Sequence, residues 1–315
     1  MDFILTTTPA SAVTLVGSLC ALLYLASFYI SENGGTRTRV QGCRRLGLLD
    51  ESNMSDQYSS EHADYEEKWV SKVKALFMYP IKSCGAIELS SSDVVATGLR
   101  YDRQFCFAQL RTEEAEKADD TIGVNSGWIH TWKFITQRKF PRLSQIQTEL
   151  WLPDDQSPDY APDLEWVESK GCLVCRFAFT PDWDWHCLFS KDTFCALREI
   201  LKAKLSARSL SAEPIVTFKL PLQPDVKRAE TYSREIMHIW KDSPEALNVT
   251  SELSQETLAK LKYFLGVSNP LGLFMADPMK RRDVFRNAPT REEAGYQPGT
   301  GFADAVSVVV SFFRL

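Results

Sequence analysis

Residues 79–85 read Tyr79-Pro80-Ile81-Lys82-Ser83-Cys84-Gly85, and an apolar run leads into them. Residues 98–103 follow about one hairpin later and read Gly98-Leu99-Arg100-Tyr101-Asp102-Arg103. The pattern predicts one strand that ends at Pro80 and a second strand that begins just after the pair Asp102-Arg103. Two such strand ends aim basic side chains at an anion, because lysine and arginine both suit phosphate oxygens. The candidate binding residues are therefore Lys82, Ser83 and Arg103.

Two other interpretations use the same residues. In one, Lys82 and Ser83 form a surface turn, and Asp102 and Arg103 merely close a hairpin. In the other, Lys82 and Arg103 bind pyridoxal phosphate or another phosphate ligand, although the lysine lacks the framing of a Schiff-base site. The residues alone do not decide between an anion site and a surface turn.

The chain has 315 residues, of which 44% are hydrophobic and 24% charged, so most of it is expected to fold around an ordinary core. Its formal net charge is -5 and its pI is about 5.6. Nonspecific binding to nucleic acid needs a basic surface, so the composition argues against a nucleic-acid partner. Any anion site is expected to be local.

Residues 3–30 carry no charge, and residues 10–30 are long enough to cross a bilayer as a helix. A signal peptide would begin with basic residues and have a shorter apolar core, whereas only Asp2 stands at the start. A buried core helix is the other alternative, but a polar segment follows this isolated run. We predict an uncleaved membrane anchor at residues 1–32 and a flexible linker at residues 33–67. Four arginines follow the span, which predicts a folded part that faces the cytosol.

The cysteines and histidines show no spacing typical of a metal site. Residues 172–175 form a C-x-x-C, but the neighbouring residues look like a strand, without a second cysteine pair or a following helix. We expect reduced, buried thiols. The four histidines lie far apart, and packed or hydrogen-bonded histidines are the expectation for them.

The folded part is predicted to be a β-rich α+β structure. A barrel domain is expected at residues 68–212, and a second domain with a helical insert at residues 213–315. Helices are predicted at residues 190–205 and 254–264, the latter with Ser254 as its cap and Gly266 just past its end. Residues 112–120 are expected to be a solvated acidic loop. Strands are predicted at residues 73–79, 87–95, 104–110, 128–137, 144–151, 171–179, 185–189, 215–220 and 306–310, and a short basic helix at 277–286.

A family resemblance favours the anion site. The chain reads Val73-x-Ala75-Leu76-x-x-Tyr79-Pro80-Ile81-Lys82-Ser83-Cys84-Gly85 and then Gly98-Leu99-x-x-Asp102-Arg103-x-Phe105. These blocks resemble the N-terminal β-barrel domain of MOSC proteins, the family of the molybdenum cofactor sulfurase C-terminal domain and the mitochondrial amidoxime reducing components. Phe134-Ile135-Thr136-Gln137-Arg138, Pro141-Arg142-Leu143 and parts of residues 288–305 are similar to later blocks of the family.

The resemblance implies a molybdenum cofactor, Mo-molybdopterin, and the reduction of N-hydroxylated substrates. It implies electrons from cytochrome b5 and its NADH reductase, and a place in the outer mitochondrial membrane. Lys82, Ser83 and Arg103 would hold the phosphate and pterin end of the cofactor. Asp304 would begin the second half of its pocket.

The chain departs from the family at its end. The family's molybdenum-ligand cysteine lies downstream of the block that ends near Ala305, whereas residues 306–315 do not resemble the family's continuation. None of the eight cysteines stands at the ligand position, so we assign no catalytic or metal residue. We expect a C-terminally truncated MOSC chain whose activity is lost or severely impaired. The alternative is a non-catalytic, membrane-anchored module or a gene-model fragment.

Overall fold

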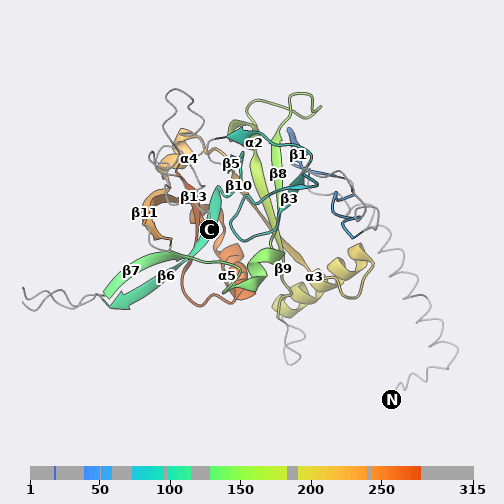
Figure 1. The fold of residues 1–315 in the computed structure, drawn as a ribbon. Coiled ribbons are helices and arrows are strands. Elements are labelled where there is room, and N and C mark those ends of the chain that lie inside the picture. The colour runs from blue at the N-terminus through green and yellow to red at the C-terminus, as the bar shows by residue number, and fades with distance from the viewer. Residues whose placement is uncertain are drawn as a thin grey trace, which may run out of the picture. The chain divides into compact units, whose positions relative to one another are not determined.

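The computed structural model describes residues 18, 39–49, 51–58, 73–95, 98–114, 128–182, 191–239 and 243–277. Contacts divide the chain into two compact units, of which the smaller includes residues 178–216 and the larger includes residues 40–177 and 217–315. The described parts contain many short strands and few helices, which confirms the predicted β-rich α+β class (Figure 1).

Five strands of the larger unit close into a barrel in the order β11-β12-β13-β6-β7. Neighbouring strands are antiparallel except β7 and β11, which pair in parallel and close the barrel. The barrel core is apolar and includes the buried side chains of Cys106, Met237 and Phe274. The strands are β6 (Phe105–Glu114), β7 (Trp128–Phe134), β11 (Ser233–His238), β12 (Glu245–Asn248) and β13 (Leu271–Ala276).

A separate four-stranded sheet has the strand order β1-β8-β9-β10. Its apolar cluster includes Val40, Cys43 and Trp151, and all of these side chains are buried. On the sheet, Glu149 pairs with Arg176 at 2.8 Å and with Arg45 at 3.5 Å, so one carboxylate ties three strands together. The strands are β1 (Cys43–Leu46), β8 (Gln147–Pro153), β9 (Cys172–Ala178) and β10 (Ile215–Pro221).

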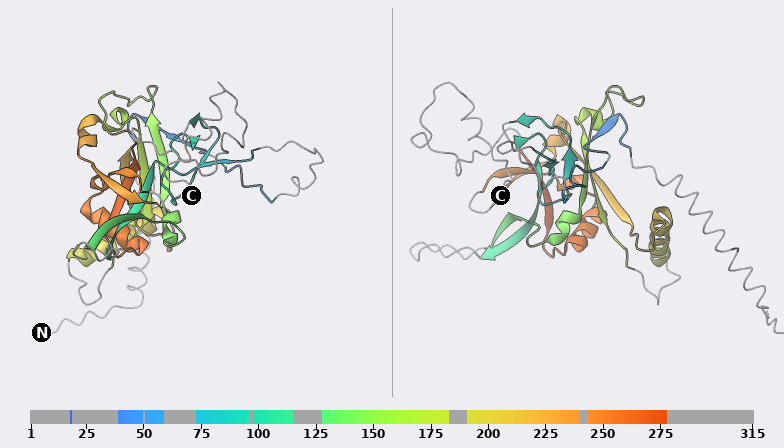
Figure 2. Two further views of the ribbon diagram at one scale, coloured as in Figure 1. Left: turned by 60° about the vertical axis from the view of Figure 1, so that its left-hand side comes forward. Right: turned by 45° about the vertical axis from the view of Figure 1, so that its right-hand side comes forward.

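Short elements connect these sheets. The strand pairs are β2 (Leu76–Met78) with β3 (Ile87–Leu89), and β4 (Val94–Val95) with β5 (Gly98–Leu99). Figure 2 shows α5, in orange, beside the green 3-10 helix η2, and Arg142 Nη1 joins them by donating to the carbonyl of Phe264 at 3.0 Å. The helices are η2 (Pro141–Gln145), α2 (Glu165–Glu168), α3 (Lys191–Ala207), α4 (Val226–Glu230), η4 (Thr250–Glu252) and α5 (Gln255–Leu265).

Both long helices agree with the sequence prediction. In α5, the hydroxyl of Ser254 accepts a hydrogen bond from the amide of Thr257 at 3.1 Å, which satisfies one of the unpaired donors of the first turn. Gly266 ends the same helix with φ 70°, in the left-handed region that glycine enters at low cost. These local signals allowed the sequence to predict the helix boundaries closely.

Some strands differ from the prediction. Thr112–Glu114 was expected to belong to an acidic loop, but these residues extend β6 and pair with Trp128–His130 of β7. The cross-strand ladder continues past the core, where charged side chains on a hairpin point to solvent at little cost. The sequence analysis also missed β11, β12 and β13. The polar residues of β11 and the short length of β12 conceal the first two, whereas the apolar run of β13 was visible between Pro270 and Asp277.

The predicted flexible linker contains an ordered strand. Cys43–Leu46 form β1 and pair with Leu150–Pro153 of β8, about 100 residues later in the sequence. Gly42 and Gly47 flank the strand with φ values of 68° and 118°, which favour glycine. Because the partner strand is distant and only two of the four residues are apolar, hydrophobic periodicity did not reveal β1.

Several predicted segments lie outside the described residues. They include the anchor at residues 1–32 apart from Ser18, the strands at 185–189 and 306–310, and all but the first residue of the helix at 277–286. Within the described part of the chain, no helix combines the length and the apolar character needed to cross a bilayer. The domain boundary between residues 212 and 213 remains a prediction, and the closed barrel takes strands from both sides of it.

Candidate functional site

The candidate site is built on two chain segments that the sequence analysis placed together. We call residues 79–84 and 101–105 the clamp. The amide of Arg103 donates to the carbonyl of Tyr79 at 2.7 Å, and the amide of Lys82 donates to the carbonyl of Phe105 at 2.8 Å. Ile81 and Phe105 form a parallel bridge between the two segments. The predicted proximity of the two strand ends is therefore present in the structure.

Three residues of the clamp have a backbone conformation that is unusual for side chains larger than glycine. The φ angles are 67° at Ser83, 69° at Tyr101 and 52° at Arg103. Asp102 holds this arrangement, because one carboxylate oxygen accepts from the amide of Tyr79 at 2.9 Å and the other lies 3.4 Å from Arg103 Nη1. Residues in such strained conformations tend to cluster at ligand clamps.

Lys82 is a buried cation at the centre of the clamp. Only 6% of the residue is exposed, and its Nζ lies 5.5 Å from the centre of the Phe134 ring. The pKa of Lys82 is lowered to about 8, chiefly by burial and also by the positive charges of Arg103 and Arg138, whereas Cys106 and Asp102 act in the opposite direction. A buried ammonium close to other cations is stabilised when an anion binds beside it.

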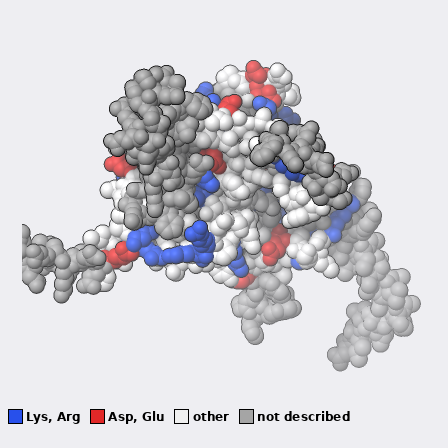
Figure 3. Space-filling model, viewed as in Figure 1, with Lys and Arg blue, Asp and Glu red and all other residues white. Residues whose placement is uncertain are grey.

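Arg138 is a candidate site residue that the sequence analysis did not assign. It stood in a block that resembles the family, but its place in the site depends on the turn after β7, where the amide of Lys139 donates to the carbonyl of Thr136 at 3.0 Å. The structure places its charge close enough to act on Lys82. Figure 3 shows lysine and arginine side chains gathered in the region of β6 and β7, although the chain as a whole is acidic.

The donor groups of the clamp, together with Arg138, fit an anion such as a phosphate. Lys82 offers a point charge, Arg103 and Arg138 offer planar forks, and Ser83 has a hydroxyl. Among the groups that shift the pKa of Lys82, Asp102 supplies a carboxylate, and this carboxylate is already paired with Arg103. The site therefore has a local excess of positive charge that a phosphate group would balance.

The described residues do not supply a metal site. Among them, no group of three or more histidine, cysteine, aspartate or glutamate side chains is placed to hold a metal ion. Burial raises the pKa of the Cys43 thiol to about 11 and that of Cys172 to about 12. Burial likewise raises the pKa of the Cys84, Cys106 and Cys175 thiols, so all five stay protonated and are poor ligands.

These cysteines confirm the expectation of buried thiols, including both members of the C-x-x-C on β9. Cys195 on α3 is exposed. Asp304, the fourth predicted cofactor residue, lies outside the described residues. The clamp thus fits an anionic group, and the five buried thiols are poor ligands for a metal.

One family model matches part of the chain. Residues 70–159 match the MOSC N-terminal beta barrel domain, a range that contains the whole clamp and strands β2 to β8. The chain is thus a protein that contains a MOSC N-terminal beta barrel domain. No curated protein sequence matches it. The closed barrel extends beyond the matched range, since β11, β12 and β13 complete it.

Proposed function

We propose that the chain is a MOSC-type oxidoreductase that holds the phosphate and pterin end of a molybdenum cofactor in the clamp. The arrangement of the clamp carries this proposal, because Lys82 is buried within the electrostatic reach of Arg103 and Arg138, and lysine and arginine side chains together suit phosphate oxygens. The match to the MOSC domain supports the cofactor class. When bound, the cofactor would supply two-electron reduction, for which we propose N-hydroxylated substrates.

The chain's own residues would position the cofactor. Lys82 would neutralise a phosphate oxygen, and the ring of Phe134 beside it would restrict the access of water. The backbone of the clamp, held by Asp102, would keep the guanidinium of Arg103 in place. We also propose Asp304 as part of the second half of the pocket, membrane attachment through residues 1–32 with a cytosolic folded part at the outer mitochondrial membrane, and electron supply by cytochrome b5 and its NADH reductase.

Replacing Lys82 by methionine is expected to reduce pterin bound per chain at least about tenfold, because a charge-assisted hydrogen bond in a buried site is lost. Full-length chain would be expressed in a host that makes the molybdenum cofactor, and pterin would be measured by fluorescence after oxidation. Lys139→Met is the matched control, since Lys139 is exposed in the turn beside Arg138. Equal pterin content in wild type and Lys82→Met, with both folded by circular dichroism, would contradict the role of the clamp.

Anion binding at the clamp is expected to weaken as pH rises through about 8, the pKa of Lys82 in the free protein. Above this pH the free protein must first take up a proton, so affinity should approach a tenfold loss per pH unit. Burial raises the pKa of the Cys106 thiol well above its ordinary value, so this neighbour of Lys82 stays neutral in the same range. Titration calorimetry with sulfate tests this, because sulfate does not itself titrate. A pH-independent sulfate affinity in wild type would exclude Lys82 as the group responsible, and Lys82→Met should show such a flat profile.

A second candidate function is a non-catalytic, membrane-anchored module. The protonated, buried thiols of the described residues favour it, since none of these thiols would ligate the metal. Molybdenum and pterin measured per chain distinguish the two functions. Stoichiometric amounts of both support the reductase, whereas the absence of both from folded chain supports the module.

A further inference from the structure

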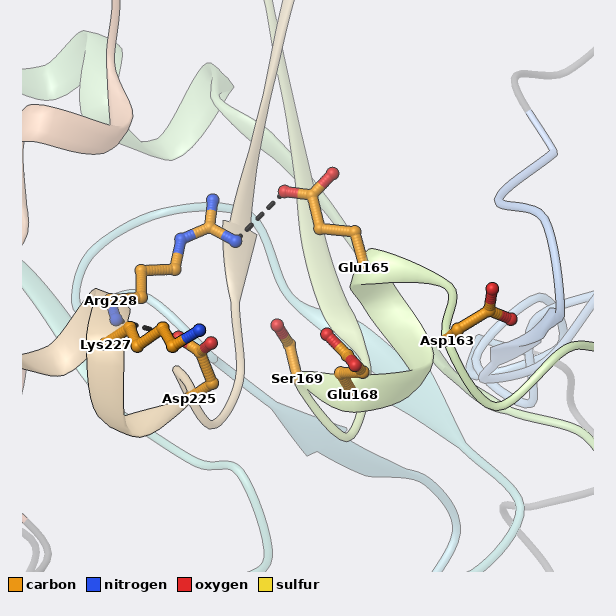
Figure 4. A pocket seen from close by; sticks show the side chains of 7 residues that line it. All are labelled: Asp163, Glu165, Glu168, Ser169, Asp225, Lys227 and Arg228. Atoms are coloured by element: carbon orange, nitrogen blue, oxygen red, sulfur yellow. Dashed lines mark hydrogen bonds and ion pairs between the residues drawn. The ribbon is translucent and has the colours of Figure 1, made fainter.

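The pocket between α2 and α4 is explained by interactions among its own residues and their neighbours. It has a volume of about 460 Å³, and acidic side chains predominate in its lining. Arg228 Nη1 donates to Glu165 at 2.9 Å (Figure 4), and the same guanidinium donates to both oxygens of Glu252. Asp225 caps α4 by accepting from the amide of Arg228 at 2.8 Å. These bonds connect the two helices without a ligand.

Gln104, which lies inside the clamp, has a buried oxygen of a different kind. In the described part of the chain, the buried side-chain atoms without a hydrogen-bond partner are Gln104 Oε1 and Thr131 Oγ1, and Thr131 lies on β7 outside the clamp. Buried polar atoms are nearly always hydrogen-bonded, because an unpartnered one has lost water without a replacement. The amide of Gln109, further along the strand that follows Gln104, pairs with Asn269 in this way. The oxygen of Gln104 therefore requires an explanation.

The backbone at Gln104 is fixed by hydrogen bonds on both sides. The amide of Phe105 donates to the carbonyl of Pro80 at 3.0 Å, and the amide of Ala276 donates to the carbonyl of Gln104 at 2.9 Å. Gln104 thus lies between the 79–84 segment of the clamp and the end of β13. Because its main chain is held on both edges, the residue cannot shift as a whole to find a partner for its side chain.

Gln104 and Lys82 lie on the same face of these segments. Side chains alternate along an extended chain, so Gln104 is on the side of Cys106, which belongs to the barrel core. Ile81 forms a parallel bridge with Phe105, so the next residue, Lys82, turns to the face opposite Phe105. That face is the one that Gln104 and Cys106 share. Long side chains at diagonal positions of neighbouring strands are within reach of each other, so one ligand can contact both Lys82 and Gln104.

The position of the Lys82 ammonium agrees with this placement. Lys82 Nζ lies 5.5 Å from the centre of the Phe134 ring, and Phe134 packs against the same barrel core. The clamp therefore presents a cation and a buried, unpartnered acceptor oxygen on one side. An inorganic anion would satisfy only the cation, since its oxygens cannot donate to the oxygen of Gln104 without a proton.

We propose that Gln104 is a further binding residue of the clamp, and that its Oε1 accepts a hydrogen bond from an N–H group of the ligand whose anionic group lies beside Lys82. The class of ligand is thus an anion that also carries amide or ring N–H groups. The pterin of the proposed cofactor has such groups, whereas sulfate has none. The role of Gln104 rests on the function proposed for the clamp.

Replacing Gln104 by methionine keeps the length of the side chain and removes its acceptor. Full-length Gln104→Met from a host that makes the molybdenum cofactor should hold about threefold to tenfold less pterin per chain than wild type, measured by fluorescence after oxidation. Its affinity for sulfate at pH 7, measured by titration calorimetry, should stay within about twofold of wild type, because sulfate offers no N–H donor. Gln156→Met is the matched control and should change neither quantity, since Gln156 is an exposed glutamine after β8, outside the clamp.

The melting temperature of the cofactor-free chain provides a second measurement. A glutamine with a purely structural role would lower this temperature when it is replaced. Removal of a buried oxygen without a partner should instead leave it unchanged or raise it. Gln104→Met from a host that cannot make the cofactor should therefore melt at or above the temperature of wild type.

The possible results separate the role of Gln104 from the function of the clamp. Equal pterin in Gln104→Met and wild type, with Lys82→Met depleted of pterin, would overturn the role of Gln104 and leave the anion site in place. A lower melting temperature of cofactor-free Gln104→Met, or a loss of sulfate affinity equal to its loss of pterin, would also overturn this role. Wild type without pterin, or Lys82→Met with unchanged pterin and sulfate binding, would refute the function proposed for the clamp and the role of Gln104 with it.

Discussion

Replacing Gly171 by alanine is expected to destabilise the protein by about 3–5 kcal/mol, from backbone strain together with a steric clash. Gly171 has φ 117°, a conformation that side chains rarely adopt. A Cβ atom would lie 2.4 Å from the carbonyl oxygen of Trp151 and 2.9 Å from Leu222 Cδ1. Trp151 cannot move away easily, because it is paired with Cys172 in the ladder of β8 and β9. Urea unfolding of wild type and variant measures the difference.

Gly98→Ala is the matched control for this prediction. Gly98 has φ 105°, close to that of Gly171, but a Cβ atom there would meet no described atom within 4 Å. Its replacement should therefore cost only the backbone strain, about 1–3 kcal/mol. If both variants lose the same stability, the close approach of Trp151 is not responsible for the large effect at Gly171.

Replacing Phe274 by alanine is expected to cost about 3–5 kcal/mol, because it opens a cavity in the barrel core. Phe274 is fully buried, and its ring packs edge-on against Trp132 with centroids 5.1 Å apart. Gly272 leaves room for both rings, since a Cβ atom there would lie within 3.0 Å of each. Thermal and urea unfolding would measure the loss.

The same variant tests whether the barrel unfolds as one unit. Phe274 lies on β13, which pairs with β6, a strand more than 150 residues earlier in the sequence. Hydrogen exchange of amides in β6 and β7 should therefore accelerate together with that of β13. Ile236→Ala on β11 is the control, because Ile236 is 56% exposed and its loss should cost less than about 0.5 kcal/mol. Unchanged protection of β6 in Phe274→Ala would contradict a cooperative barrel.

The parts of the fold that the sequence predicted well are those with local signals. Ser254 and Gly266 mark the two ends of α5 through their own backbone preferences. The apolar run of β9 and the proline near the end of β2 are also local signals, because each indicates the structure of only a few neighbouring residues. The clamp was predicted for a similar reason, since Tyr79 and Arg103 are separated by a short hairpin-like segment and meet through backbone hydrogen bonds.

Other features depend on partners that are distant in the sequence. β1 is positioned by its pairing with β8, and β11 closes the barrel by pairing with β7 in parallel. Neither pairing leaves a local pattern, because a strand's register is selected by the packing of its whole face. The charge of Arg138 acts on Lys82 for the same reason, as the position of Arg138 depends on how β7 lies against β6.

The sequence by itself determined the β-rich class, the ends of the long helices and the proximity of Lys82 to Arg103. In each case the decisive interactions lie within about 25 residues, and residue preference is sufficient to predict them. Only the tertiary structure decided how the barrel closes, that Lys82 is buried with a lowered pKa, and that a pocket with an acidic lining lies between α2 and α4. Burial and electrostatic coupling depend on all neighbours in space, and those neighbours come from strands and helices far apart in the chain.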